Sequence, residues 1–160
     1  MTKSMINDVA DYIIVKLDEG RVGANVLKLQ KLLYYVQAWH LAFKDEPLFA
    51  GKFQAWVHGP VNRAIYNRFA ETHTMYSAVT RADIAKDFDS NRIPAESRAH
   101  IDEILEAYAP MSGTQLEAMT HDEEPWIKAR GNLKPSARCE VELDENLIKE
   151  FFRSELKKTT

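Results

Sequence analysis

The sequence predicts a mainly α (α+β) protein: a compact single-domain helical fold around one central apolar helix, with a short β element near residues 52–57. Three observations carry this prediction. Apolar residues cover most of the circumference of a helix expected over residues 25–43, so this helix needs neighbours on several sides. Several further stretches repeat apolar residues with helical spacing. Residues 53–57 alternate apolar and polar side chains, as a short half-buried strand does.

The length and composition fit one domain that spans residues 1–160. A chain of 160 residues can bury a sizeable core, and 45% hydrophobic with 28% charged residues is ordinary for a globular protein. The net charge of −3 gives no reason to expect non-specific binding to nucleic acid. One cysteine, Cys139, excludes a disulfide within the chain, and no apolar run predicts a leader or membrane span. We therefore expect a cytoplasmic protein with no membrane partner.

The first two helices are expected over residues 5–19, ended by Gly20, and over residues 25–43, where Asn25 can cap the first turn. The apolar face of the second helix includes Leu29, Leu32, Leu33, Val36, Trp39 and Phe43. Its opposite side has a narrow polar strip of Gln30, Gln37, His40 and Lys44, so we expect His40 on the surface. Burial of Trp39 predicts that Trp39→Ala costs roughly 3–5 kcal/mol.

The middle of the chain begins with a turn at Pro47, followed by the predicted short strand. Gly59 and Pro60 predict a sharp restart, with Pro60 at the first position of the next helix. Residues 71–97 have no clean period, which predicts an irregular surface segment with a short strand near residues 78–81.

The last third of the chain returns to helical spacing, beginning with a helix around Ile101 that Pro110 ends. Ser112 and Gln115 have the spacing of a capping box, which predicts a short helix after them. Thr120 and Glu123 repeat that spacing and predict a second cap, before Trp126 anchors the segment onto the core. A final amphipathic helix is expected over about residues 144–157.

Two regions, residues 25–69 and 116–130, contain short blocks in a fixed order: KLQKLLYYVQAW, PLF, FQAWVHGPV, IYNRF and LEAMTHDEEPWIKAR. In this order and spacing the blocks resemble the SocA-like antitoxin family, also called the Panacea domain. The residues that carry the resemblance are Lys28, Gln30, Lys31, Tyr34, Tyr35, Trp39, Gly59, Pro60, Val61, His121, Pro125 and Trp126.

The resemblance implies an antitoxin of a bacterial or prophage toxin–antitoxin pair, with a cognate protein toxin as its partner. At least one member of the family is thought to deliver its toxin to a protease, which makes a Clp-type machine a candidate second partner. None of this follows from composition or periodicity.

The residues themselves predict no enzyme, no cofactor and no metal. The chain has no G-x-S-x-G elbow, no glycine-rich phosphate loop and no paired cysteines. A small metal-dependent hydrolase is one alternative, with His58, His121 and Asp122 as its candidate residues. Adjacent residues point in different directions, however, so a structural turn is the favoured interpretation of residues 121–124.

A DNA-binding regulator of its own operon is the other alternative. Lys28 and Lys31 precede Tyr34 and Tyr35, and nucleic acids need cations for phosphates and flat rings for bases. Solvated lysines at the start of a helix explain the same pattern. No helix-turn-helix with a basic second helix is evident.

Direct binding of a protein needs exposed aromatic anchors among polar residues, and one corner of the chain supplies them. The candidate partner-binding residues are Trp56, His58, Asn62, Arg63 and Tyr66. Arg63 and Tyr66 are three residues apart, so on a helix they are neighbours. The alternative is that Tyr66 packs inward and Arg63 is merely solvated.

Overall fold

The computed structural model describes residues 4–158, and in that range it contains seven α-helices and one two-stranded antiparallel sheet. In chain order the elements are α1 (Ile6–Glu19), α2 (Val26–Lys44), β1 (Gln54–Trp56), β2 (Gly59–Val61), α3 (Arg63–Phe69), the 3₁₀ turns η1 (Arg81–Asp83) and η2 (Ser90–Arg92), α4 (Ala95–Tyr108), α5 (Gly113–His121), α6 (Glu124–Arg130) and α7 (Glu145–Lys158). The predicted mainly α fold with a short β element is confirmed. No helix within residues 4–158 is long and apolar enough to cross a bilayer.

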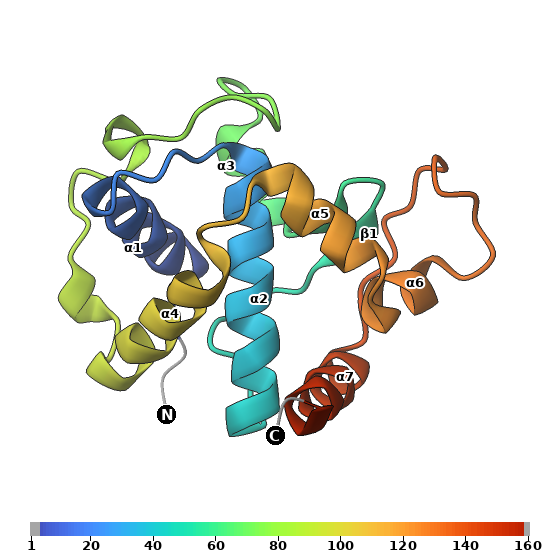
Figure 1. Ribbon diagram of the computed structural model, residues 1–160. Helices are drawn as coiled ribbons and strands as arrows, with labels where there is room; N and C mark the ends of the chain where they lie inside the picture. Colours follow the sequence, from blue (N-terminus) through green and yellow to red (C-terminus); the bar gives the residue numbers. More distant parts are fainter. Residues whose placement is uncertain (1–3, 159–160) are drawn as a thin grey trace.

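Helix α2 runs through the middle of the molecule, with α1 and α4 on one side and α7 on the other (Figure 1). It begins after Asn25, whose side chain accepts a hydrogen bond from the Lys28 backbone N–H at 2.8 Å, as predicted. Helices α1, α4, α5 and α7 and strand β2 all pack against it. Leu29, Leu32 and Leu33 are fully buried as a result. The central position of this helix is therefore confirmed.

Three residues of the polar strip of α2, Gln30, Gln37 and His40, are buried, and only Lys44 at its end is exposed. The amide of Gln37 donates to the Phe49 carbonyl at 2.8 Å and accepts from the Leu48 N–H at 2.8 Å. The ring nitrogen Nδ1 of His40 lies 2.6 Å from the Glu46 carbonyl, so the predicted surface position of His40 is wrong. The loop after α2 folds back over this side of the helix, and its backbone needs hydrogen-bond partners there.

Trp39 is half-buried, not buried as expected, and Phe43 is 48% exposed. The two rings stack with their centroids 5.4 Å apart, and the Trp39 indole donates to the Tyr108 hydroxyl at 2.8 Å. Trp39 therefore covers the edge of the core. The cost of 3–5 kcal/mol predicted for a fully buried ring is too large for this position.

The expected strand is one half of a β-hairpin, in which Gln54 pairs with Val61 and Trp56 pairs with Gly59. Gly59 and Pro60 lie in strand β2, so the predicted helix start at Pro60 is wrong. Helix α3 begins instead after Asn62, whose side chain accepts from the Ile65 N–H at 3.1 Å. The other edge of β1 binds a later segment through hydrogen bonds of 2.8 Å, Ala55 N–H to Val141 O and Leu143 N–H to Phe53 O.

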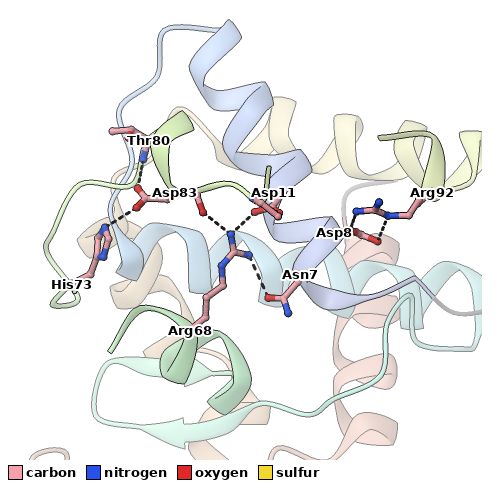
Figure 2. A network of polar contacts seen from close by, with 9 residues as sticks. Asn7, Asp8, Asp11, Arg68, His73, Thr80, Asp83 and Arg92 are labelled. Atoms are coloured by element: carbon pink, nitrogen blue, oxygen red, sulfur yellow. Dashed lines mark hydrogen bonds and ion pairs between the residues drawn. The ribbon is translucent and has the colours of Figure 1, made fainter. Parts of the chain in front are cut away.

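The segment expected to be irregular over residues 71–97 is irregular over 71–94, because α4 begins at Ala95. The strand expected near residues 78–81 is reduced to one bridge between Asn25 and Ala78. Figure 2 shows what holds this segment in place. The Arg68 guanidinium pairs with the Asp11 carboxylate at 2.5 Å and donates to the Asp83 carbonyl at 2.8 Å. The Asp83 carboxylate in turn accepts from the Thr80 N–H. Arg68 thus ties α3, α1 and the irregular segment together.

Of the two capping boxes predicted in the last third of the chain, one is confirmed and the other is wrong. Ser112 and Gln115 form the predicted capping box. The cap predicted for Thr120 and Glu123 is wrong, because the Thr120 hydroxyl donates to the Glu117 carbonyl at 2.7 Å and Glu123 caps no backbone N–H with its side chain. The final helix, expected over about residues 144–157, is α7.

We expect Asp11→Ala to lower the free energy of unfolding by about 3 kcal/mol, because removal of one partner of a buried ion pair leaves the other charge uncompensated. Asp11 is 2% exposed, and Arg68 has no other carboxylate partner among the described residues. Chemical denaturation measures the loss. The matched control is Asp8→Ala, which removes the partner of the more exposed Arg92 and should change stability much less. Equal losses in the two variants would contradict a special role for Arg68.

Candidate functional site

Four of the five candidate partner-binding residues lie together at one groove. Strand β1 ends at Trp56, His58 lies in the turn of the hairpin, and α3 begins at Arg63, so the short strand β2 brings these side chains and Tyr66 into one place. The groove has a volume of about 610 Å³. Its remaining lining comes from Val26, Val57, Phe69, Ala70, His73, Thr74, Met75, Ser136, Arg138, Cys139 and Glu140. Segments far apart in the sequence therefore form its walls.

Arg63 lies over two aromatic rings of the groove. Its guanidinium carbon is 4.7 Å from the centre of the Trp56 ring and 5.6 Å from that of Tyr66, and the two rings meet edge to face at 4.8 Å. Its guanidinium also forms an ion pair with Glu140, which Arg138 approaches to 3.7 Å. Trp56, Arg63 and Tyr66 are all half-buried. The groove therefore presents a stack in which the Arg63 guanidinium lies over two aromatic rings that meet edge to face.

His58 lies beside the groove, with Nδ1 3.3 Å from a Glu117 carboxylate oxygen. Asn62 differs from the other candidates because it is buried. Its side chain caps α3 and donates to the Lys52 carbonyl at 3.1 Å, and it does not line the groove. Asn62 thus holds the start of α3 from inside the protein, and its buried side chain is not available to a partner.

Two of the residues that carry the family resemblance in α2, Gln30 and Lys31, hold the hairpin in place. Lys31 is fully buried and its ammonium group donates to the Pro60 carbonyl at 2.8 Å. The Gln30 amide makes two hydrogen bonds with the backbone of Asn62, at 2.8 and 3.0 Å. Gly59 has a φ of +88°, and a Cβ there would lie 2.8 Å from the Lys31 side chain. Only glycine at position 59 allows the hairpin to lie this close to α2 without displacing neighbouring side chains.

The interpretation of Lys28 and Lys31 as phosphate contacts is wrong. Both lysines are buried, and Lys28 donates to the Ala109 carbonyl at 2.6 Å. Tyr34 and Tyr35 are buried as well and cannot stack on bases. Burial lowers the pKa of Lys28 and lowers the pKa of Lys31 to about 7, because an ammonium ion loses its hydration there.

The second block of the resemblance supports the hairpin from the other side. The His121 ring stacks on Trp126 at 4.1 Å, and the Trp126 indole donates to the Trp56 carbonyl at 2.8 Å. Pro125 is buried at the start of α6, and Val61 is buried in β2. Burial lowers the pKa of His121, which favours its neutral form. This block therefore fixes the position of Trp56.

No metal centre is formed by His58, His121 and Asp122. Within residues 4–158 no group of three or more His, Cys, Asp or Glu side chains is placed to hold a metal ion. Cys139 is buried in the wall of the groove.

Sequence reasoning missed Arg130, which holds the far wall of the groove. It is buried, and its guanidinium donates to the Ala55 carbonyl at 2.9 Å and to the Ala137 carbonyl at 2.6 Å. It also lies 4.9 Å from the centre of the Trp126 ring. The sequence places Arg130 in the last turn before Gly131, which signals a helix end and says nothing of the loop that Arg130 binds.

The fold and the groove together define a helical domain in which several motif residues, among them Gln30, Lys31 and Trp126, hold the hairpin that borders the groove. A family model described as antitoxin SocA-like, Panacea domain, matches residues 29–127, and the chain belongs to this family. It is 30% identical over 153 residues to Antitoxin SocA from Caulobacter vibrioides (strain NA1000 / CB15N), an alignment that covers 91% of this chain and 80% of the relative. No solved structure matches the chain.

We expect the stability of the protein to rise with pH as the buried Lys31 loses its proton. The pKa of Lys31 is about 7 in the folded state and 10.5 when exposed, so between these values the unfolded chain binds more protons and each pH unit stabilises the fold. Burial of the charged Lys31 ammonium lowers the unfolding free energy by its full amount below pH 7, and this destabilisation decreases as the pH rises above 7. In Lys31→Met this contribution is absent. The difference in unfolding free energy between wild type and Lys31→Met should therefore change by about 1.4 kcal/mol per unit between pH 8 and 9.

Urea denaturation at pH 7, 8 and 9 measures this difference. Lys128→Met, at an exposed lysine of α6, is the control and should follow the wild-type profile. Parallel profiles for wild type and Lys31→Met would show that Lys31 is ionised in the same way in the folded and unfolded states.

Proposed function

We propose that this protein is an antitoxin that neutralises a cognate protein toxin by binding it directly in the cytoplasm. The family membership supports the class of function, and the half-exposed stack of Trp56, Arg63 and Tyr66 supports the mode of action. Tryptophan, tyrosine and arginine are the residues that most often supply the binding energy of protein interfaces. A groove of about 610 Å³ beside them gives a partner side chain a place to enter.

The burial of the motif residues favours protein binding over contact with DNA. Lys28 and Lys31 use their ammonium groups inside the fold, so the only basic residues beside an aromatic surface in the groove are Arg63, Arg138, His58 and His73. Arg63 and Arg138 share the carboxylate of Glu140. An arginine that stacks on tryptophan is suited to a protein partner because it offers both apolar area and directed hydrogen bonds.

Delivery of the toxin to a Clp-type protease is an extension of the same proposal. An antitoxin that acts as an adaptor would shorten the half-life of the toxin in cells that contain the protease and would leave it unchanged in cells without it. A toxin half-life independent of the protease would limit the function to direct neutralisation.

We expect the double variant Arg63→Glu, Tyr66→Ala to bind the toxin at least 30-fold more weakly than wild type, because loss of interface hot spots costs about 2 kcal/mol or more. The toxin to test is the product of the adjacent open reading frame. Co-purification and rescue of growth in cells that express it measure the effect. Circular dichroism must show that the variant is folded.

The matched control is Arg81→Glu, which changes an exposed arginine outside the groove and should leave binding unchanged. If the double variant binds and silences the toxin as wild type does, the interface lies on another surface. If the adjacent product is not toxic and does not co-purify, the proposed function itself fails.

A further inference from the structure

Glu123 is a half-buried carboxylate that lacks a cationic partner. It lies between α5 and α6, and both of its oxygens are 3.1 Å from the Tyr35 hydroxyl, which donates to them. No lysine, arginine or histidine within the described range forms an ion pair with it. Burial and the nearby carboxylates of Glu155 and Asp122 raise the pKa of Glu123 to about 8. The fold thus keeps an acid where its charged form is poorly compensated.

Aromatic rings extend from this carboxylate to the surface. The rings of Tyr35 and Tyr108 stack at 4.3 Å, and the Tyr108 hydroxyl accepts the hydrogen bond from the Trp39 indole. Trp39 stacks on the exposed Phe43. Tyr108, Trp39 and Glu123 are each partly accessible. The face of an aromatic ring attracts cations, and it also covers the aliphatic stem of a long basic side chain.

Further acidic residues surround this place. Glu155 of α7 is close enough to raise the pKa of both Glu123 and Tyr108. A small hollow of about 200 Å³ beside it is lined by Glu124, Glu150 and Glu155, together with Lys158, which pairs with Glu155 at 3.3 Å. The charge of this hollow is therefore negative, and it complements a basic partner.

We propose that Glu123, Tyr35, Tyr108, Trp39 and Glu155 form a binding site for an arginine or lysine side chain of a protein partner. The cation neutralises the Glu123 carboxylate, and its stem lies against the rings of Trp39 and Tyr108. The exposed ring of Phe43 then contacts an apolar residue beside the basic one. None of these residues lines the groove at Trp56, so the site stands whether or not that groove binds the toxin.

Binding of a cation to this site is coupled to release of a proton. Tyr35 of α2, Glu155 of α7 and the neighbouring Asp122 are the titratable groups that shift the pKa of Glu123, and none of them is a cation. Burial and the Glu123 carboxylate in turn raise the pKa of Tyr34 of α2 and Tyr108 of α4. With a pKa of about 8, the carboxyl group is mostly protonated at pH 7 and must ionise to bind. Affinity should therefore rise as pH increases from 6 to 8, by up to about tenfold per unit for a single coupled proton.

The test uses two capped nine-residue peptides, one with a central arginine flanked by leucines and one with citrulline, which has the same shape without the charge. Binding to the full chain is followed by NMR at the Trp39 indole N–H. We expect the arginine peptide to bind at least tenfold more tightly than the citrulline peptide. Equal affinities would overturn the proposal.

Glu123→Gln removes the charge and keeps an acceptor for Tyr35, and we expect it to abolish the preference for arginine. Glu106→Gln, at an exposed carboxylate of α4, should retain the preference within twofold. Loss of preference in both variants would indicate diffuse electrostatic attraction and would overturn the site.

A second measurement needs no variant. Calorimetry of the wild-type protein with the arginine peptide at pH 7, in buffers of different ionisation enthalpy, counts the protons released. We expect close to one proton per bound peptide. Binding without proton release would show that Glu123 does not receive the cation.

Discussion

The burial of polar side chains on α2 is the constraint on which the rest of the structure depends. A helix surrounded on several sides has no water to bind its amide and ammonium groups, and each buried group left unpaired costs roughly 1–3 kcal/mol. Gln30, Lys31 and Gln37 satisfy this requirement with backbone groups of Asn62, Pro60 and Phe49. The helix thereby specifies the path of the chain from the end of α2 to the start of α3. The groove is a consequence of that path, because it lies where the hairpin is held.

The helices were predictable from sequence because their signals are local. Apolar spacing, the Asn25 cap and the Ser112 capping box act within a few residues, and all three are present in the structure. The burial of Gln30, Gln37 and His40 was not predicted, since a pattern of polar residues on a helix does not reveal whether their partner is water or a folded-back loop. Thr120 and Glu123 have the spacing of a cap, but Glu123 instead accepts a hydrogen bond from Tyr35, 88 residues away.

The candidate site likewise contains residues that the sequence predicts and residues that it does not. Trp56, His58, Arg63 and Tyr66 were predictable as a group, because one hairpin and one helical turn bring them together. Glu140 and Arg138 come from a distant loop that Arg130 holds through backbone carbonyls, and nothing in the local pattern of residues 130–140 predicts which part of the fold they meet. Asn62 was assigned to the polar side of a helix expected to begin at Pro60, whereas the helix begins after Asn62 and makes it the cap.

The stack at Arg63 raises the question of whether a partner can gain access to Trp56 beneath it. The cation–π contacts of a partly exposed arginine contribute roughly 0.5–1 kcal/mol, and an exposed ion pair such as that with Glu140 contributes at most about 1 kcal/mol. Displacement of Arg63 thus costs on the order of 1–2 kcal/mol, less than burial of a tryptophan hot spot commonly returns. The hairpin beneath Arg63 is harder to displace, because the side chains of Lys31, Gln30 and Trp126 form hydrogen bonds with its backbone. The groove therefore combines an arginine held by weak contacts with an aromatic base held by buried hydrogen bonds, and the proposed interface does not depend on Arg63 staying in place.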